Sequence, residues 1–109
     1  MAYDDGLAQM LRDDLAEIDA ITEKKMFGGL CFLLNGNMLC GVHSKGTMFR
    51  VGKEHETKAR AIDGAGPMQF TGRKMGGMID VTEEATADDT RRGEWLRLAL
   101  DFAGSLPAK

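Results

Sequence analysis

Two cysteines flank the strongest turn signal in the chain and are the residues best placed for chemistry. Asn35-Gly36 separates two apolar runs, and this dipeptide favours a two-residue hairpin loop because both turn positions need positive φ. With that loop, the numbers of facing residues have a constant sum, and Cys31 lies opposite Cys40 in a non-hydrogen-bonded pair. The Cα atoms of such a pair approach to about 4.5 Å, near the short end of the range that a disulfide spans. The spacing therefore predicts a cross-strand thiol pair.

The same register predicts the surroundings of the two thiols. A second turn at Ser44-Lys45-Gly46, taken as a three-residue loop, places Arg50 opposite Cys40, where a guanidinium would favour the thiolate. Cys31 and Cys40 then have two interpretations. They form either a redox-switchable pair or, more simply, two reduced cysteines that pack as small apolar side chains.

Both faces of the predicted sheet are largely apolar in this register. One face would carry Cys31, Leu33, Met38, Cys40, Val42 and Met48, and the other Leu30, Phe32, Leu34, Leu39, Phe49 and Val51. Two terminal helices can cover only one face, so the second packs either against other elements of the monomer or against a partner, such as a second copy. The eight methionines suit an adaptable contact surface as well as a core.

A candidate basic contact patch consists of five residues, Lys24, Lys25, Arg50, Arg73 and Lys74. A loop near Arg73 that folds over the first hairpin would bring them together. Such a patch could meet an acidic protein surface or a nucleic-acid backbone. The alternative is that these charges are solvated and protect strand edges from pairing.

The sequence contains no recognisable catalytic or metal-binding motif. His43 and His55 are the only histidines, and we expect both at the surface. Neither has a metal-ligand spacing with the cysteines. Phosphate-loop, nucleophile-elbow and zinc-protease motifs are absent. We therefore expect a non-enzymatic protein without catalytic residues, metal site or cofactor.

Sequence patterns predict two terminal helices with strands between them. Apolar residues recur at helical spacing over 4–18 and again over 87–105. Turn signals between these segments indicate short strands, one short helix over 54–62 and a loop over 71–77. The expected strands cover 24–27, 30–34, 37–42, 47–51, 68–70 and 78–81. This order predicts an α+β fold, an antiparallel β-meander sheet flanked by an N-terminal and a C-terminal helix.

Length, charge and apolar content narrow the function classes. The 109 residues suit one domain, and a net charge of −3 does not create the positive field that non-specific nucleic-acid binding needs. The longest apolar run, 30–34, is far shorter than the roughly 20 residues of a membrane span, and the acidic start lacks a signal segment. Two cysteines without a signal indicate a reducing compartment. We expect a cytoplasmic protein that does not bind membranes or, on its own, nucleic acid.

Several segments, in matching order and spacing, resemble the N-terminal domain of the TfoX/Sxy competence-regulator family. They are Lys24-Lys25-Met26-Phe27-Gly28-Gly29-Leu30, Leu34-Asn35-Gly36-Asn37-Met38, Phe49-Arg50-Val51-Gly52, Pro67-Met68-Gln69-Phe70 and Phe102-Ala103-Gly104-Ser105-Leu106-Pro107. The resemblance extends over nearly the whole chain. It implies that residues 1–109 form a single TfoX N-terminal-like domain.

The resemblance also implies a class of function. Two-domain members of this family positively regulate DNA-uptake genes together with the cyclic-AMP receptor protein, and the family has no motif of catalytic residues. We expect this chain to be a single-domain relative, a non-catalytic regulatory domain that contacts another protein or a second copy of itself. The alternative is a small-molecule or redox-sensing module that uses Cys31 and Cys40, or a pocket under the loop 71–77.

Overall fold

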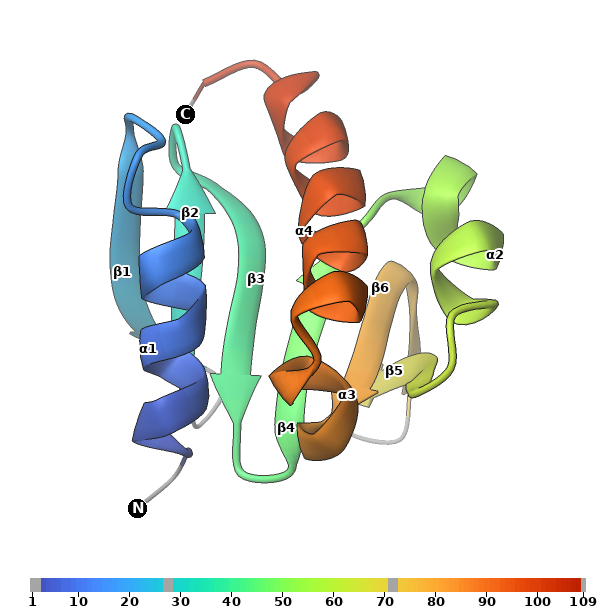
Figure 1. Ribbon diagram of the computed structural model, residues 1–109. Helices are drawn as coiled ribbons and strands as arrows, with labels where there is room; N and C mark the ends of the chain where they lie inside the picture. Colours follow the sequence, from blue (N-terminus) through green and yellow to red (C-terminus); the bar gives the residue numbers. More distant parts are fainter. Residues whose placement is uncertain (1–2, 27–28, 71–72, 109) are drawn as a thin grey trace.

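The computed structural model describes residues 3–26, 29–70 and 73–108. Within them, six strands form one antiparallel sheet and four helices lie against one of its faces (Figure 1). The elements in chain order are α1 (Asp5–Asp14), β1 (Ile21–Met26), β2 (Gly29–Leu34), β3 (Asn37–His43), β4 (Gly46–Arg50), α2 (Lys53–Arg60), β5 (Ala65–Phe70), β6 (Arg73–Thr82), α3 (Glu83–Ala87) and α4 (Asp89–Gly104). The predicted α+β fold with a helix at each end is confirmed.

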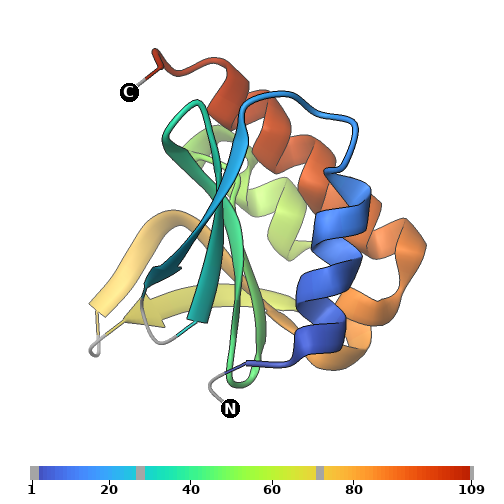
Figure 2. The ribbon, with the colours of Figure 1, turned by 90° about the vertical axis from the view of Figure 1, so that its left-hand side faces the viewer.

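The strands are ordered β1-β2-β3-β4-β6-β5 across the sheet. The first four follow the chain as a meander, whereas β6 pairs with β4 and leaves β5 at the edge. Figure 2 shows the helices on one side of the sheet and the β5–β6 hairpin projecting away from them. One face of the sheet is therefore covered by helices and the other is not.

Aspartates begin the two terminal helices. The Asp4 side chain accepts hydrogen bonds from the N–H groups of Gly6 (2.7 Å) and Leu7 (3.1 Å), and that of Asp88 accepts one from Arg91 N–H (2.9 Å). These bonds satisfy N–H groups that have no acceptor within the helix. The predicted starts of both helices agree with the structure to within two residues.

The first helix is shorter than its apolar spacing predicts. It ends at Asp14 because the chain must reverse before β1, and Ala20 adopts a φ of 67° in this connection. Leu15 and Ile18 still face the core from the connecting segment. The helical spacing therefore predicts correctly that these residues pack against the core. Its prediction that they belong to the helix is wrong.

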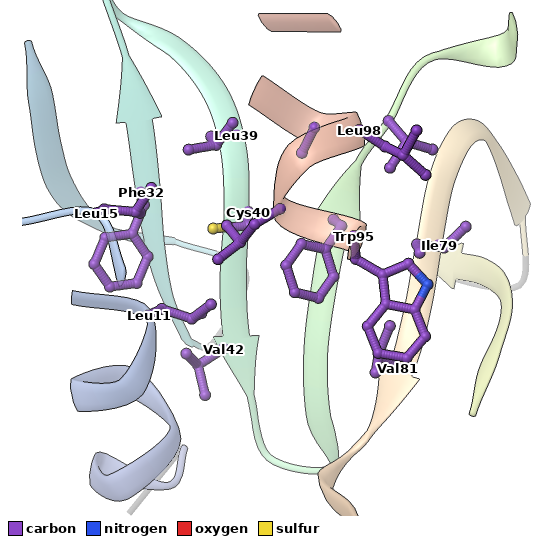
Figure 3. Packing of buried hydrophobic residues seen from close by; sticks show 14 of the residues in the cluster. Leu11, Leu15, Phe32, Leu39, Cys40, Val42, Ile79, Val81, Trp95 and Leu98 are labelled. Carbon is purple, nitrogen blue, oxygen red and sulfur yellow. The ribbon is translucent and has the colours of Figure 1, made fainter. Parts of the chain in front are cut away.

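The core lies between the sheet and the helices (Figure 3). Trp95 of α4 is fully buried, and its ring centroid lies 6.0 Å from that of Phe49 on β4. Its indole Nε1–H donates a hydrogen bond of 3.0 Å to the carbonyl oxygen of Ala59 in α2. Trp95 thus attaches α2 to α4 and to the sheet at once.

A membrane-spanning helix is not found in the described residues, because none of the helices combines the length and the apolar composition that a bilayer requires.

The predicted tight turn between β2 and β3 is confirmed. Asn35 and Gly36 have φ angles of 52° and 83°, and Leu34 pairs with Asn37 across the turn. Both turn residues occupy the left-handed region that asparagine and glycine tolerate best.

Candidate functional site

The register of β2 and β3 separates the two cysteines. Pairing follows the prediction beside the turn, then shifts by one residue so that Phe32 faces Cys40 and Cys31 faces Gly41. The extra residue is Leu39 in β3, which forms a β-bulge. Because side chains alternate between faces, the bulge turns Cys40 toward the helices and leaves Cys31 on the other face. The predicted cross-strand thiol pair is therefore wrong.

Each thiol is enclosed in a separate apolar cluster. Cys40 belongs to the main core (Figure 3), whereas Cys31 packs with Met48 and Met78 on the opposite face. Burial raises the pKa of both thiols, that of Cys31 to about 11. The thiolate is the reactive form of cysteine, so burial disfavours the reactive form of both residues.

The predicted position of Arg50 is also wrong. His43 pairs with Gly46, so the loop between β3 and β4 has two residues instead of three, and Phe49 rather than Arg50 faces Cys40. The guanidinium carbon of Arg50 lies 5.2 Å from the centroid of the Phe102 ring.

Among the described members of the candidate basic patch, Lys24 and Lys25 do not lie beside Arg50 as predicted. Lys24 and Lys25 are exposed on β1 at one edge of the sheet, whereas Arg50 lies on β4, three strands away. Strands are spaced by about 4.8 Å, which separates β1 from β4 by roughly 14 Å. Arg73 and Lys74 begin β6, and their side chains lie outside the described residues.

We call the face of the sheet without helices the open face. The bulge removes Cys40 and Val42 from it, which corrects the predicted division of the apolar residues. Met48 packs over Gly41, its partner in the neighbouring strand. The contact is so close that a Cβ atom on Gly41 would lie 2.7 Å from Met48 Cε. The centre of the open face is thus buried within the monomer, while Leu33 and Met38 remain half-buried on it.

A cavity of about 550 Å³ lies where α2 begins and α4 ends. We call it the α2–α4 cavity; its lining consists of Arg50, Gly52, Lys53, Glu54, His55, Gly76, Gly77, Asp101, Phe102 and Ser105. No local pattern in the sequence indicates it, because these residues come from β4, α2, β6 and α4 and from the residues that flank the two helices. Two of them, Gly76 and Gly77, belong to the segment 71–77, under which the sequence predicts a pocket.

Close backbone contacts build the wall of this cavity. Gly52 has a φ of 83°, and a Cβ there would be 2.4 Å from Phe102 Cδ1, so the ring lies directly on the backbone. The carbonyl oxygen of Gly77 accepts hydrogen bonds from Val51 and Gly52 N–H, both 2.9 Å. In return, Gly77 N–H donates to Glu56 Oε1 of α2 at 2.8 Å. These bonds hold β6 against the start of α2.

Both histidines are partly buried and paired with aspartates, which sequence reasoning missed. His55 Nε2 lies 2.8 Å from Asp101 Oδ2 in the α2–α4 cavity, and its side chain is 25% exposed. His43 Nε2 lies 2.6 Å from Asp80 Oδ1, and its side chain is 17% exposed. The partners are 46 and 37 residues apart in the chain, so no local pattern could have indicated them.

Ser105, His55 and Asp101 are the residue types of a nucleophilic triad, and all three line the α2–α4 cavity. In such a triad, the imidazole accepts the hydrogen bond of the hydroxyl. Here Ser105 Oγ donates to the carbonyl oxygen of Phe102 at 2.6 Å, as often occurs at a helix end, and His55 Nε2 is engaged by Asp101. The three side chains are therefore not arranged to activate the serine. Across the described ranges, no three His, Cys, Asp or Glu side chains group as metal ligands.

Comparison with known protein families gives a match. The family model described as TfoX N-terminal domain matches residues 13–103, from the end of α1 almost to the end of α4. No curated protein and no solved structure matched the chain. The matched range covers most of the chain and contains the whole sheet, so the chain belongs to the TfoX N-terminal domain family.

Proposed function

We propose that this chain is a non-catalytic regulatory domain that acts by binding another protein through the open face of its sheet. The supporting observation is that all four described helices pack on the opposite face, which leaves Leu33 and Met38 on a face without a helical layer (Figures 1 and 2). A role connected with transcription regulation is what the resemblance to the competence regulators implies. Family membership by itself supports only a domain of this type.

The two edges of the sheet favour this choice of surface. β1 forms one edge and exposes Lys24 and Lys25, and charged side chains of this kind oppose the addition of another strand. β5 forms the other edge and contains Pro67, which has no N–H group to donate. A partner that adds a strand would meet both obstacles, whereas a partner that packs on the open face does not need a free strand edge.

The side chains on the open face suit a protein partner. Met38 packs on the cluster of Cys31, Met48 and Met78, so the contact region is continuous with a buried apolar layer. Methionine side chains are flexible and adapt to the shape of an apolar partner. Lys24 and Asp80 alternate onto this same face at its two ends and would supply polar contacts at the rim.

The test compares charged substitutions on and off the open face. Met38→Glu and Leu33→Glu place a carboxylate where an apolar partner would pack, and Thr57→Glu places the same charge on exposed α2 as a matched control. Retained proteins would be quantified by mass spectrometry after low-salt pull-down, with folding checked by circular dichroism. We expect the wild type and Thr57→Glu to retain the same partner and the two open-face variants to lose it.

Two results would contradict the proposal. One is that the wild type retains no protein at low salt, and the other is that Met38→Glu and Leu33→Glu retain the same partner as Thr57→Glu. Light scattering of the purified chain, done in parallel, shows whether the partner is a second copy: a dimer that Met38→Glu converts to a monomer identifies it as such.

A further inference from the structure

We infer that the α2–α4 cavity binds the phosphate group of a small soluble molecule, with Arg50 and Lys53 as the two cations that hold it. The inference is independent of the protein-binding proposal, because it uses neither Leu33 nor Met38. It concerns a site for which the family match assigns no role.

Arg50 is positioned for an anion that the described residues do not provide. Its guanidinium is held over the Phe102 ring at 5.2 Å, and the residue is half-buried. Within the described residues, no carboxylate oxygen lies within 4.0 Å of its nitrogens. A partly dehydrated cation gains from an oxyanion partner, and a planar guanidinium can donate two parallel hydrogen bonds to one phosphate.

Lys53 supplies a second positive charge from a different element. It is the first residue of α2, and its Cε lies 3.3 Å from the position that a Cβ on Gly76 would occupy. The absence of a side chain at Gly76 therefore leaves room for the lysine stem beside β6. In the described part of the chain, Lys53 is in no ion pair either. Two cations that converge on one cavity suit a dianion better than a single carboxylate.

The cavity also contains two carboxylates, and they determine where the anion would bind. Asp101 Oδ2 lies 2.8 Å from His55 Nε2, so this oxygen already has a hydrogen-bond partner within the cavity. Glu54 is exposed next to Lys53 and opposes an incoming anion. The phosphate would therefore lie on the side of Arg50 and Phe102, with the rest of the molecule in the remainder of the cavity. The total cavity volume of about 550 Å³ is within the usual range for small-molecule sites.

The experiment is a titration of ¹⁵N-labelled protein with inorganic phosphate at constant ionic strength, with sodium chloride as the control salt. Amide shifts of Gly77, Phe102 and Ser105 report on the cavity. We expect saturable shifts with phosphate that chloride does not produce. Adenosine monophosphate, as a phosphate-bearing small molecule, should bind at least as tightly as phosphate alone.

Variants with opposite expected effects make the assignment specific. Arg50→Gln should weaken phosphate binding at least tenfold and Lys53→Gln severalfold, whereas Glu54→Gln should tighten it. Lys58→Gln removes an exposed lysine of the same helix outside the cavity and should leave binding unchanged. Lys53→Gln keeps the inference testable even where Arg50→Gln disturbs the packing of Phe102.

The inference is overturned by any of four results. Phosphate shifts that do not exceed those of chloride remove the site, and an Arg50→Gln variant that binds like the wild type removes its main ligand. Equal weakening by Lys58→Gln would mean that only net charge matters. Exclusion of adenosine monophosphate while phosphate binds would show that the cavity does not accept a phosphate-bearing molecule of this size.

Discussion

At the scale of single residues, a cluster of polar contacts around a buried arginine joins α1 to the C-terminal half of the chain. Arg92 of α4 is almost completely buried, and its Nε donates a hydrogen bond of 2.6 Å to Asp14 Oδ2 at the end of α1. It also donates to Asp89 Oδ1 (2.8 Å) and to the carbonyl oxygen of Thr86 (3.0 Å). The hydrogen bond with Asp14 is the main reason that the pKa of Arg92 is raised, and the charge persists at any physiological pH.

The first prediction concerns this network. Asp14→Ala leaves the buried guanidinium with Asp89 as its remaining carboxylate, and we expect the free energy of unfolding to fall by about 2 kcal/mol. Asp19→Ala removes an exposed aspartate from the connection after α1 and serves as the control. Urea denaturation of both variants measures the difference. Equal stability of the two variants would contradict a stabilising role for the Asp14–Arg92 contact.

The second prediction concerns the pH dependence of stability that follows from the buried Cys31 thiol. Burial raises the pKa of Cys31 from 9.0 to about 11, so the folded state keeps a proton that the unfolded chain loses as the pH rises past 9. The contribution of Cys31 to stability is therefore complete below pH 9 and declines toward pH 11, by up to about 1.4 kcal/mol per pH unit. Unfolding experiments from pH 8 to 10.5 should show a shallower decline for Cys31→Ala than for the wild type.

The positions of the two cysteines lead to a test of the hypothesis that Cys31 and Cys40 form a redox-switchable pair. We expect mild oxidation to produce no intramolecular disulfide between Cys31 and Cys40, because they lie on opposite faces of the sheet. Non-reducing peptide mapping of the folded protein measures this directly. A Cys31–Cys40 peptide link obtained without prior unfolding would contradict the register of β2 and β3.

At the scale of elements, Trp95 connects two helices and the sheet through one side chain. It is fully buried, packs against Phe49, and donates its indole N–H to the carbonyl oxygen of Ala59 near the end of α2. α2 otherwise carries mostly polar residues and has one buried residue, Ala59, among those described. The hydrogen bonds to Gly77 hold the start of α2, and the contact with Trp95 holds its end, so the shape of the α2–α4 cavity depends on both.

The third prediction follows from this dependence. Trp95→Phe removes the hydrogen bond to Ala59 and leaves a cavity in the core, and we expect a loss of about 3 kcal/mol in the free energy of unfolding. Hydrogen exchange should accelerate most in α2, since the variant loses its attachment there. A uniform change across all helices would contradict the specific role of Trp95 in holding α2.

At the scale of the whole molecule, the protein has a sheet with one helical layer and two edge strands. Lys24 and Lys25 are exposed on β1 at one edge, and Pro67 lies on β5 at the other. Of the two interpretations of the lysines, membership of a basic patch with Arg50 is wrong, while a role in protecting the edge stays a prediction.

The fourth prediction tests that role. Replacing both Lys24 and Lys25 with valine converts β1 into an apolar edge strand, and we expect concentration-dependent association through this edge. Dynamic light scattering and thioflavin T fluorescence measure it. The matched control is Lys58→Val on exposed α2, which should remain as dispersed as the wild type. Equal association of both variants would assign the effect to lost charge and not to the edge.

Short-range patterns in the sequence determined most of the elements. The turn at Asn35-Gly36 and the caps at Asp4 and Asp88 depend on residues within one turn of each other, so their chemistry can be recognised locally. The α+β class follows from the order of these elements, and the family from segments spread along the chain.

Tertiary structure alone decided the arrangement of the candidate sites. The bulge at Leu39 has no local signal, because it follows from the need to bury Cys40 and Val42 beneath the helices, and it moves the two cysteines to opposite faces. The pairing of His55 with Asp101 and the convergence of Arg50 and Lys53 require β4, α2 and α4 to be packed together. Contacts between residues far apart in the chain form only once the core has positioned their elements.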